Sequence, residues 1–409
     1  MKNEILASAG RLEHAMTEAL IRLCSVPAVS PHSGGTGEDA KIIELAKIID
    51  ELGLKDITIR VEHVDDDKAP SGRRPSLFLE YPGRKSRRLC ILSHIDVVPE
   101  GDRSAWTLDP FKPEVRGSRI YGRGVSDNGM CLTASLFALK SLQDAGITPE
   151  YTVLLAFVAD EELGSHYGLE QLIESDIFRA DDLVLVPDGG NDAGDFIEVA
   201  EKAVWRLKFT VTGKQSHAAY PNHGINACRA ANILACEVDR ALHERFMQAN
   251  DVFDPPFSTF EPTKRAANVP AVNIVPGREV FEFDCRVLPG ESLDEAERIV
   301  RGIVADVETR TGVKVELEID RSDAAEPTSP ESDVCKLLVK SVREVLGIET
   351  KCGGVGGGTF AVFFRRKGIP AVVWAQECDG VAHQPDEYTE IAYLVNNAKV
   401  FALMMAGDK

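Results

Sequence analysis

Four short apolar runs, separated by helical or polar stretches, constrain the fold of this chain most strongly. They cover residues 89–92, 153–158, 183–186 and 371–374, and a helical apolar pattern at residues 131–145 lies between the first two. Continuous apolar runs of this length are typical of strands that are buried on both faces. Their alternation with helical segments predicts an α/β domain whose mostly parallel sheet is covered by helices. Further helices are expected at residues 11–24, 38–52, 334–346 and 391–405.

The pattern changes between residues 202 and 320, where strands and helices follow the order β-α-β-β-α-β. This order predicts a small ferredoxin-like α+β unit, with two helices on one face of its sheet. A proline-rich loop is expected at residues 251–270, and Ser292 is expected to cap the second helix. The expected strands cover residues 204–211, 272–274, 280–287 and 313–319, and the expected helices cover residues 225–246 and 292–311. We therefore expect a catalytic domain in two parts, residues 1–201 and 321–409, with an inserted domain at residues 202–320.

Composition narrows the classes of partner. The chain has 65 acidic and 46 basic residues among 409, a formal net charge of −19, which disfavours binding to nucleic acid. No apolar run reaches the roughly 18 residues that a membrane span needs, and the first residues do not resemble a signal peptide. The nine cysteines include no C-x-x-C pair, which favours reduced thiols. We expect a cytoplasmic protein without a membrane or nucleic-acid partner.

Polar side chains that can bind metals follow the apolar runs. In open α/β sheets, ligands bind beyond the carboxyl ends of the strands, so these side chains are expected at one edge of the sheet. The candidates are His94 and Asp96 after the first run, Asp160, Glu161 and Glu162 after the second, Asp188 after the third, His383 after the fourth, and Asp127 in the glycine-rich turn at residues 122–129.

These residue types suit zinc, which binds imidazole nitrogen and carboxylate oxygen. They are more numerous than one tetrahedral ion needs, and they would suit two ions, about 3.5–4 Å apart, that share a carboxylate. Each residue alone has a plainer explanation. A single histidine after a strand is often structural, an acidic triplet is usually a solvated turn, and Asp188 before two glycines can be a turn residue.

The chain resembles the dinuclear zinc amidohydrolases, a family that includes acetylornithine deacetylase, succinyl-diaminopimelate desuccinylase, aminoacylase and bacterial glutamate carboxypeptidase. The resemblance covers essentially the whole chain. The matching segments are Ser-His-Ile-Asp-Val-Val-Pro at residues 93–99, Trp-Thr-Leu-Asp-Pro at 106–110, Gly-Arg-Gly-Val-Ser-Asp at 122–127, Asp-Glu-Glu-Leu-Gly-Ser at 160–165, Gly-Lys-Gln-Ser-His-Ala at 213–218 and His-Gln-Pro-Asp-Glu at 383–387.

The resemblance implies a zinc-exopeptidase-like fold and a role for each matching residue. Asp127 would bridge the two ions; His94 and Asp188 would bind one of them, and Glu162 and His383 the other. Glu161 would be the general acid and base, and Asp96 would orient His94 through its second ring nitrogen. His217 lies in the inserted dimerisation and lid domain and would stabilise the oxyanion in the site of a partner subunit, which implies a homodimer. Asn273 and Arg286 match positions that contact the substrate.

A glycine-rich run at residues 353–359 lacks the Lys-Ser/Thr ending of a phosphate-binding loop. A loop with little side-chain bulk lets backbone N–H groups approach an anion, and we expect Gly357 and Gly358 to line the substrate cleft. Several members of the family have Ser-Asp after the Gly-Thr at the end of this run, whereas this chain has Phe360 and Ala361. This difference concerns the distal end of the substrate.

The expected function is hydrolysis of the amide bond of an N-acyl amino acid by metal-activated water, with two zinc ions, or cobalt or manganese, in each chain. A di- or carboxypeptidase with the same metal centre is the near alternative. An inactive binding protein of the same fold and a nucleotide-dependent transferase are more distant alternatives.

Overall fold

The computed structural model describes residues 1–407, which form two compact units. The first unit comprises Met1–Val199, Thr328–Gly353 and the chain from Thr359 on, and the second comprises Ala200–Pro327 and Gly354–Gly358. Within residues 1–407, no helix combines the length and the apolar character that crossing a membrane requires.

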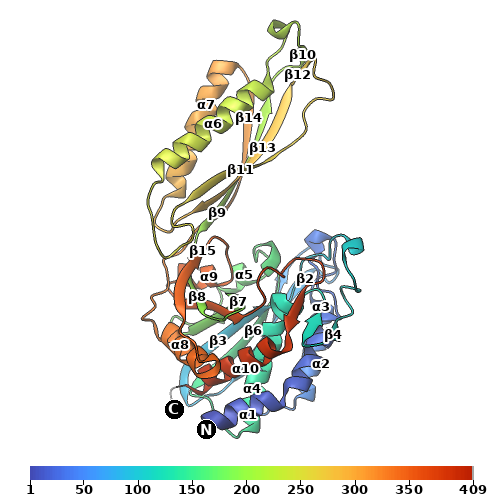
Figure 1. The fold of residues 1–409 in the computed structure, drawn as a ribbon, viewed down its shortest axis with the longest axis vertical. Coiled ribbons are helices and arrows are strands. Elements are labelled where there is room, and N and C mark those ends of the chain that lie inside the picture. The colour runs from blue at the N-terminus through green and yellow to red at the C-terminus, as the bar shows by residue number, and fades with distance from the viewer. Residues whose placement is uncertain (408–409) are drawn as a thin grey trace. The chain divides into compact units, whose positions relative to one another are not determined.

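An eight-stranded sheet lies at the centre of the first unit (Figure 1). The strand order is β1-β2-β6-β3-β7-β16-β8-β15, and the run β6-β3-β7-β16 is parallel, whereas β1, β2 and β8 pair antiparallel. The bounds are β1 (Thr58–Asp65), β2 (Arg73–Tyr81), β3 (Lys85–His94), β6 (Tyr151–Val158), β7 (Leu183–Asn191), β8 (Phe196–Glu201), β15 (Lys351–Val355) and β16 (Ala371–Gln376). The four apolar runs lie in the parallel strands, so the expected α/β fold is confirmed.

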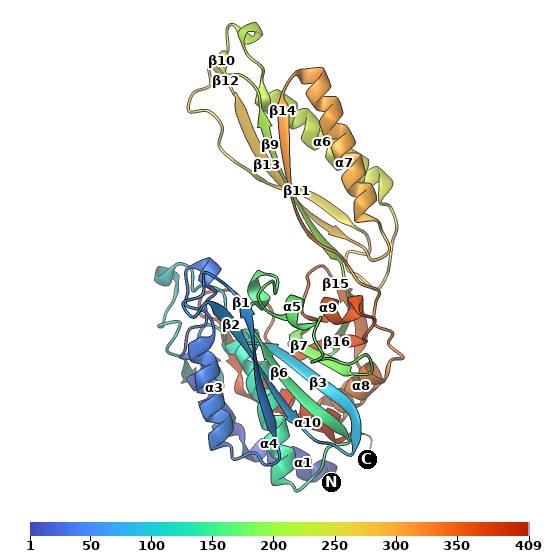
Figure 2. The same cartoon turned by 180° about the vertical axis from the view of Figure 1, so that it is seen from behind.

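Successive residues of these strands pack into two different cores. Leu89 and Ile91 of β3 belong to the core beneath α1, α2, α3, α4, α8 and α10, while Cys90 and Leu92 belong to the core beneath α5 and α9. Figure 2 shows β1, β2, β6 and β3 side by side. Because side chains alternate between the faces of a strand, only a continuous apolar run can fill both cores.

The helices of the first unit end close to where the sequence predicts. The helix expected at residues 11–24 begins later, because Leu12 separates it from an additional first helix. The bounds are α1 (Lys2–Arg11), α2 (Glu13–Cys24), α3 (Asp39–Glu51), α4 (Cys131–Asp144), α5 (Leu169–Leu172), α8 (Asp333–Leu346), α9 (Ala361–Arg366) and α10 (Ile391–Ala406). A small sheet has the order β17-β5-β4, formed by β4 (Glu114–Arg116), β5 (Arg119–Tyr121) and β17 (Tyr388–Glu390).

The second unit has a four-stranded antiparallel sheet of order β11-β13-β9-β14. Two long helices pack on it, and Trp205, Leu207 and Phe209 of β9 lie in the core between them. Its elements are β9 (Ala203–Thr212), α6 (Ala227–Arg245), β11 (Thr259–Arg265), β13 (Arg278–Val287), α7 (Leu293–Thr311) and β14 (Lys314–Ser322), with a two-stranded ribbon of β10 (Ser216–His217) and β12 (Ile274–Val275). Chain order and strand order are those of a ferredoxin-like fold, as expected.

One strand of this unit was predicted wrongly. Residues 272–274 do not join the four-stranded sheet; the second strand is instead β11, which lies inside the expected loop at residues 251–270. It is an edge strand, its residues from Glu261 on are exposed, and its register shifts between Pro262 and Lys264. Proline and exposed side chains removed the apolar signal on which the prediction relied.

Candidate metal centre

The first group of possible metal donors forms where β3 and β7 end. His94 is the last residue of β3, Asp188 lies in β7, and Asp127 lies in the short irregular helix Val125–Met130 before α4. Nε2 of His94 lies 2.8 Å from Oδ1 of Asp127 and 3.4 Å from Oδ1 of Asp188. One donor atom from each of the three residues lies within 4.8 Å of the others.

The second group shares one residue with the first. Nε2 of His383 lies 3.0 Å from Oδ2 of Asp127 and 3.0 Å from Oε2 of Glu162. Asp127 therefore turns one carboxylate oxygen toward each histidine. All five expected donors belong to these two groups, and Asp127 belongs to both.

The electrostatics of the two groups fit divalent cations. Burial alone would lower the pKa of His94, but the carboxylates of Asp188 and Asp127 outweigh burial and raise it well above its usual value. Hydrogen bonds to Asp127 and Glu162 raise the pKa of His383 to about 10. The carboxylates thus favour positive charge at this position. A cation held by neutral imidazole and ionised carboxylates supplies that charge.

Glu161 lies beside both groups but belongs to neither. Its N–H donates to Oδ1 of Asp96 at 3.1 Å, and the N–H of Glu162 donates to Oδ2 of Asp96 at 3.2 Å. Burial, followed by the charge of Asp188, raises the pKa of Glu161 well above its usual value. A carboxyl group with a raised pKa next to a metal centre is suited to taking up and releasing a proton.

The second ring nitrogen of His94 faces Asp96. Nδ1 of His94 lies 3.0 Å from the backbone oxygen of Asp96 and 3.6 Å from its carboxylate. The backbone oxygen is thus the nearer acceptor, while the carboxylate accepts the two N–H groups of the loop that follows β6. Asp96 connects the end of β3 to the segment that carries Glu161 and Glu162.

Sequence reasoning missed Glu387 as a functional candidate. Its Oε1 accepts the N–H groups of Ser126 at 3.0 Å and of Asp127 at 3.2 Å, and its Oε2 pairs with the buried Arg123 at 2.6 Å. Glu387 therefore fixes the backbone that carries the shared carboxylate. The available signal was its place four residues after His383 in a matching motif.

A cavity of about 190 Å³ opens beside Asp127 and Asp188, and its wall also contains Asn128, Glu377 and Asp379. Nδ2 of Asn128 donates to Oδ1 of Asp188 at 2.8 Å. Burial, followed by the charge of Asp188, raises the pKa of Glu377 to about 8. Glu377 directly follows β16, so the strand-end rule that indicated the other acids would have found it.

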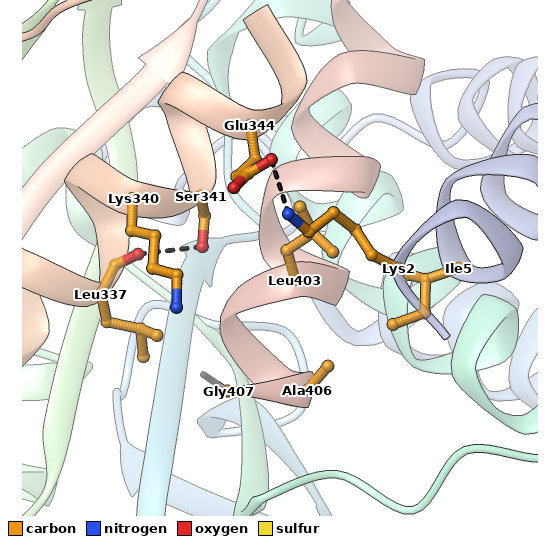
Figure 3. A pocket seen from close by; sticks show the side chains of 9 residues that line it. All are labelled: Lys2, Ile5, Leu337, Lys340, Ser341, Glu344, Leu403, Ala406 and Gly407. Carbon is orange, nitrogen blue, oxygen red and sulfur yellow. Dashed lines mark hydrogen bonds and ion pairs between the residues drawn. The ribbon is translucent and has the colours of Figure 1, made fainter. Parts of the chain in front are cut away.

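A second cavity, of about 160 Å³, lies among α1, α8 and α10 (Figure 3). Three of the polar side chains drawn there have partners within the wall: Lys2 pairs with Glu344 at 2.7 Å, and Oγ of Ser341 donates to the backbone oxygen of Leu337 at 2.9 Å. Glu344 is the one carboxylate among its lining residues. This cavity therefore lacks the donors that a metal centre needs.

Five of the expected site residues belong to the second unit, and three of them, His217, Asn273 and Arg286, have polar side chains. His217 is exposed, and its Nδ1 accepts the N–H of Ala219 at 3.0 Å, which leaves the ring proton on Nε2. The backbone oxygen of Asn273 accepts the N–H of Ala218 at 2.9 Å. Arg286 donates to both carboxylate oxygens of Asp284, at 2.6 and 3.2 Å, and to the backbone oxygen of Gly356 at 2.6 Å.

The glycine-rich run is divided between the units, and Gly354–Gly358 belongs to the second. A Cβ at Gly357 or Gly358 would meet no atom within 4 Å, so packing does not require glycine there. Phe360 and Ala361, where the chain differs from the family pattern, are buried in the core beneath α5 and α9. The difference therefore fills the core and does not line a cleft.

Comparison with known proteins places these residues in context. Peptidase family M20/M25/M40 matches residues 90–407, a range that contains both donor groups. An uncharacterised metallohydrolase of Methanococcus maripaludis is 37% identical over 399 residues, 93% of this chain and 95% of the relative. A succinyl-diaminopimelate desuccinylase of Acinetobacter baylyi is 25% identical over 385 residues, with 93% and 95% covered. The crystal structure of an M20 family metallo-carboxypeptidase from Sulfolobus solfataricus is similar with a TM-score of 0.75 and 21% identity, covering 96% of this chain and 99% of that one.

Proposed function

The chain belongs to peptidase family M20/M25/M40 and is a metal-dependent hydrolase, and we propose that it cleaves the amide bond of an N-acyl amino acid at a centre of two divalent ions. One observation carries the proposal: Asp127 presents one carboxylate oxygen to His94 and the other to His383. Two donor groups that share a carboxylate are the arrangement that two adjacent ions require. Zinc is the proposed metal because it binds imidazole and carboxylate together, and cobalt or manganese suit the same donors.

Side chains of the protein are proposed to transfer the proton and to position the group that transfers it. The two donor groups would hold the divalent ions, which would supply polarisation of the substrate's carbonyl oxygen and a lower pKa of water. Glu161 takes the proton of the attacking water and passes it to the departing nitrogen. No covalent intermediate with the protein is needed. Asp96 holds the backbone of Glu161 while this transfer takes place.

The second unit is proposed to complete the site in a homodimer. His217 offers an N–H at Nε2, which suits the oxyanion that develops on the substrate. Arg286 has five N–H donors, of which three are engaged, and Asn273, Gly357 and Gly358 are the other proposed substrate contacts. The similarity to a desuccinylase supports an acylated amino acid as the substrate, and a di- or carboxypeptidase remains the alternative for the same centre.

Metal content and substrate release test the proposal together. The purified protein is analysed by elemental mass spectrometry, treated with a chelator, and assayed after addition of zinc, cobalt or manganese. The substrates are N-acetyl and N-succinyl amino acids and dipeptides, with and without a side-chain ammonium group, because the carboxyl groups of Glu377 and Asp379 in the cavity wall can accept hydrogen bonds from such a group.

We expect about two ions per chain and amine release that chelation abolishes and metal restores. Preference for acylated amino acids supports a deacylase, and preference for dipeptides supports the peptidase alternative. A protein that binds a single ion at saturation, or that hydrolyses nothing with any metal, contradicts the proposal.

A further inference from the structure

A buried arginine lies behind the segment that carries Glu161. Arg74 of β2 is 1% exposed, and its guanidinium donates to the carboxylate of Glu38, with Nε 2.6 Å from Oε2. Nη1 of Arg74 lies 3.1 Å from Oδ1 of Asp160 and 3.3 Å from Oδ2 of Asp66. All three carboxylates are buried. A planar guanidinium with five N–H donors is the one side chain that can engage several carboxylates at once.

Asp160 is held in a conformation that it would not adopt freely. Its φ is +68°, in the left-handed region that non-glycine residues avoid. Besides the contact with Arg74, its Oδ2 accepts the N–H of Tyr167 at 2.9 Å, and its backbone oxygen accepts the N–H of Ser165 at 2.6 Å. Such strain persists only where the surroundings fix it. The surroundings here are one ion pair and two hydrogen bonds.

The direction of the chain after Asp160 determines where the next two side chains point. Glu161 and Glu162 follow immediately, and their N–H groups donate to the two carboxylate oxygens of Asp96. The segment is therefore fixed from two sides, by Asp96 at the end of β3 and by Arg74 at the start of β2. A loop that turns after a strand has no sheet hydrogen bonds of its own, so these contacts set its position.

We propose that Arg74 and Asp160 are positioning residues for the hydrolysis: their buried ion pair holds the backbone at Asp160 so that the Glu161 carboxylate faces the metal donors. The inference rests on the proposed function, because it assigns proton transfer to Glu161. A purely structural role for the same ion pair predicts a different result, since the loss of any carboxylate around Arg74 would then have the same effect.

Asp66 provides the matched control. It contacts the same Nη1 atom as Asp160, is equally buried, and bonds to His32 at 3.1 Å and to the N–H of Lys68 at 3.0 Å. It thus belongs to the same cluster of charges but has no contact with the segment of Glu161. Asp160→Asn and Asp66→Asn each remove one negative charge and keep the size of the side chain.

The experiment compares kcat, KM, bound metal and thermal stability of the two variants in the full-length, metal-loaded protein. For Asp160→Asn we expect kcat to fall about tenfold to a hundredfold, with KM within about twofold and bound metal unchanged, because a small misplacement of a reacting group has an effect of that size. For Asp66→Asn we expect kcat within about twofold of the wild type, even if the stability of both variants falls. If Asp160→Asn does not fold, Asp160→Glu keeps the charge and moves it by one methylene, and the same fall in kcat is expected.

Three results would overturn the inference: wild-type kcat in the folded Asp160 variant, an equal loss of kcat in Asp66→Asn, or a loss of bound metal that accounts for the change. A wild-type protein that hydrolyses no substrate of the panel would instead remove the proposed function, before any variant is compared.

Discussion

At the scale of single residues, two residues in or next to the candidate metal centre have a left-handed backbone conformation. Asp160 and His383 have φ values of +68° and +63°. This conformation costs a non-glycine residue about 1–3 kcal/mol, which other contacts must offset. For Asp160 the contact is with Arg74, and for His383 the contacts are with Asp127 and Glu162. Aspartate and histidine tolerate this region better than most residues; Asp160 directly precedes Glu161 and Glu162, and His383 is itself a candidate donor.

Glu161→Gln tests the assignment of proton transfer. The amide keeps the size of the side chain but cannot accept the proton of water, so kcat is expected to fall about 10²–10⁴-fold. Bound metal is expected to stay unchanged because Glu161 belongs to neither donor group. Steady-state kinetics and elemental mass spectrometry on one preparation measure both quantities.

Glu170→Gln is a matched control for this variant. Glu170 lies nearby in α5 and pairs with His166 in an exposed contact, so its loss is expected to leave kcat unchanged. Near-normal turnover in Glu161→Gln, or an equal loss in Glu170→Gln, would exclude Glu161 as the acid and base.

The sequence indicated the five candidate donors because four of them lie in or after buried parallel strands, whose carboxyl ends meet at one edge. It did not indicate Glu387, whose Oε1 accepts the N–H groups of residues 126 and 127 and whose Oε2 pairs with Arg123, because these contacts depend on how two distant segments meet. Whether the backbone oxygen or the carboxylate of Asp96 lies nearer to His94 also depends on loop geometry. The grouping of these side chains was thus readable from the sequence, whereas the backbone contacts that position them were not.

At the scale of elements, an uninterrupted run of at least four apolar residues determined which strands of the central sheet could be predicted; β2 and β8 are buried but have no such run, and they were not predicted. Strands β3, β6, β7 and β16 fill two cores, and each contains a predicted apolar run. Strands β1 and β11 expose most of their residues, and neither was predicted. An edge strand pairs on one side only and is stabilised by backbone hydrogen bonds that leave no apolar pattern.

The start of α7 provides a test at this scale. Oγ of Ser292 accepts the N–H of Glu295 at 3.2 Å, as the sequence predicts for a helix cap. Replacing Ser292 with alanine leaves that N–H without its partner, and the free energy of unfolding is expected to fall by about 1 kcal/mol. Urea unfolding followed by circular dichroism measures the change. Ser292→Thr keeps the hydroxyl and is expected to retain most of the stability; equal losses in both variants would contradict the capping role.

At the scale of the whole molecule, the chain leaves the first unit after Val199 and returns at Thr328. The N–H of Thr328 donates to the backbone oxygen of Val199 at 2.8 Å, so the two ends of the inserted segment are adjacent. Adjacent ends allow a separate unit to be inserted without disturbing the first.

The change of sequence pattern had indicated boundaries at 202 and 320. The membership of Gly354–Gly358 in the second unit had no signal in the sequence, because the hydrogen bonds that hold this segment, such as the one from Lys202 N–H to the oxygen of Val355, join distant parts of the chain.

The proposed homodimer leads to a test that uses two inactive variants. His217 belongs to the second unit. If it completes the site of the partner subunit, each site takes Glu161 from one subunit and His217 from the other, so His217→Ala and Glu161→Gln remove groups that come from different subunits. A mixed dimer then contains one site with both residues intact. Because random mixing gives half mixed dimers, each with one complete site of two, about a quarter of the wild-type activity is expected to return. The variants are unfolded, mixed and refolded together, or co-expressed with different tags, and kcat is measured per chain.

Each variant refolded alone is the control, and sedimentation confirms that mixed dimers form. A double variant carrying both changes in one chain, mixed with wild-type chains, distinguishes action across the dimer from action within one chain. If His217 acts across the dimer, neither site of that mixed pair is complete, so the pair is inactive; if it acts within its own chain, the pair keeps one active site. Mixed dimers of the single variants that recover no activity would show that His217 serves its own subunit or lies outside the reaction.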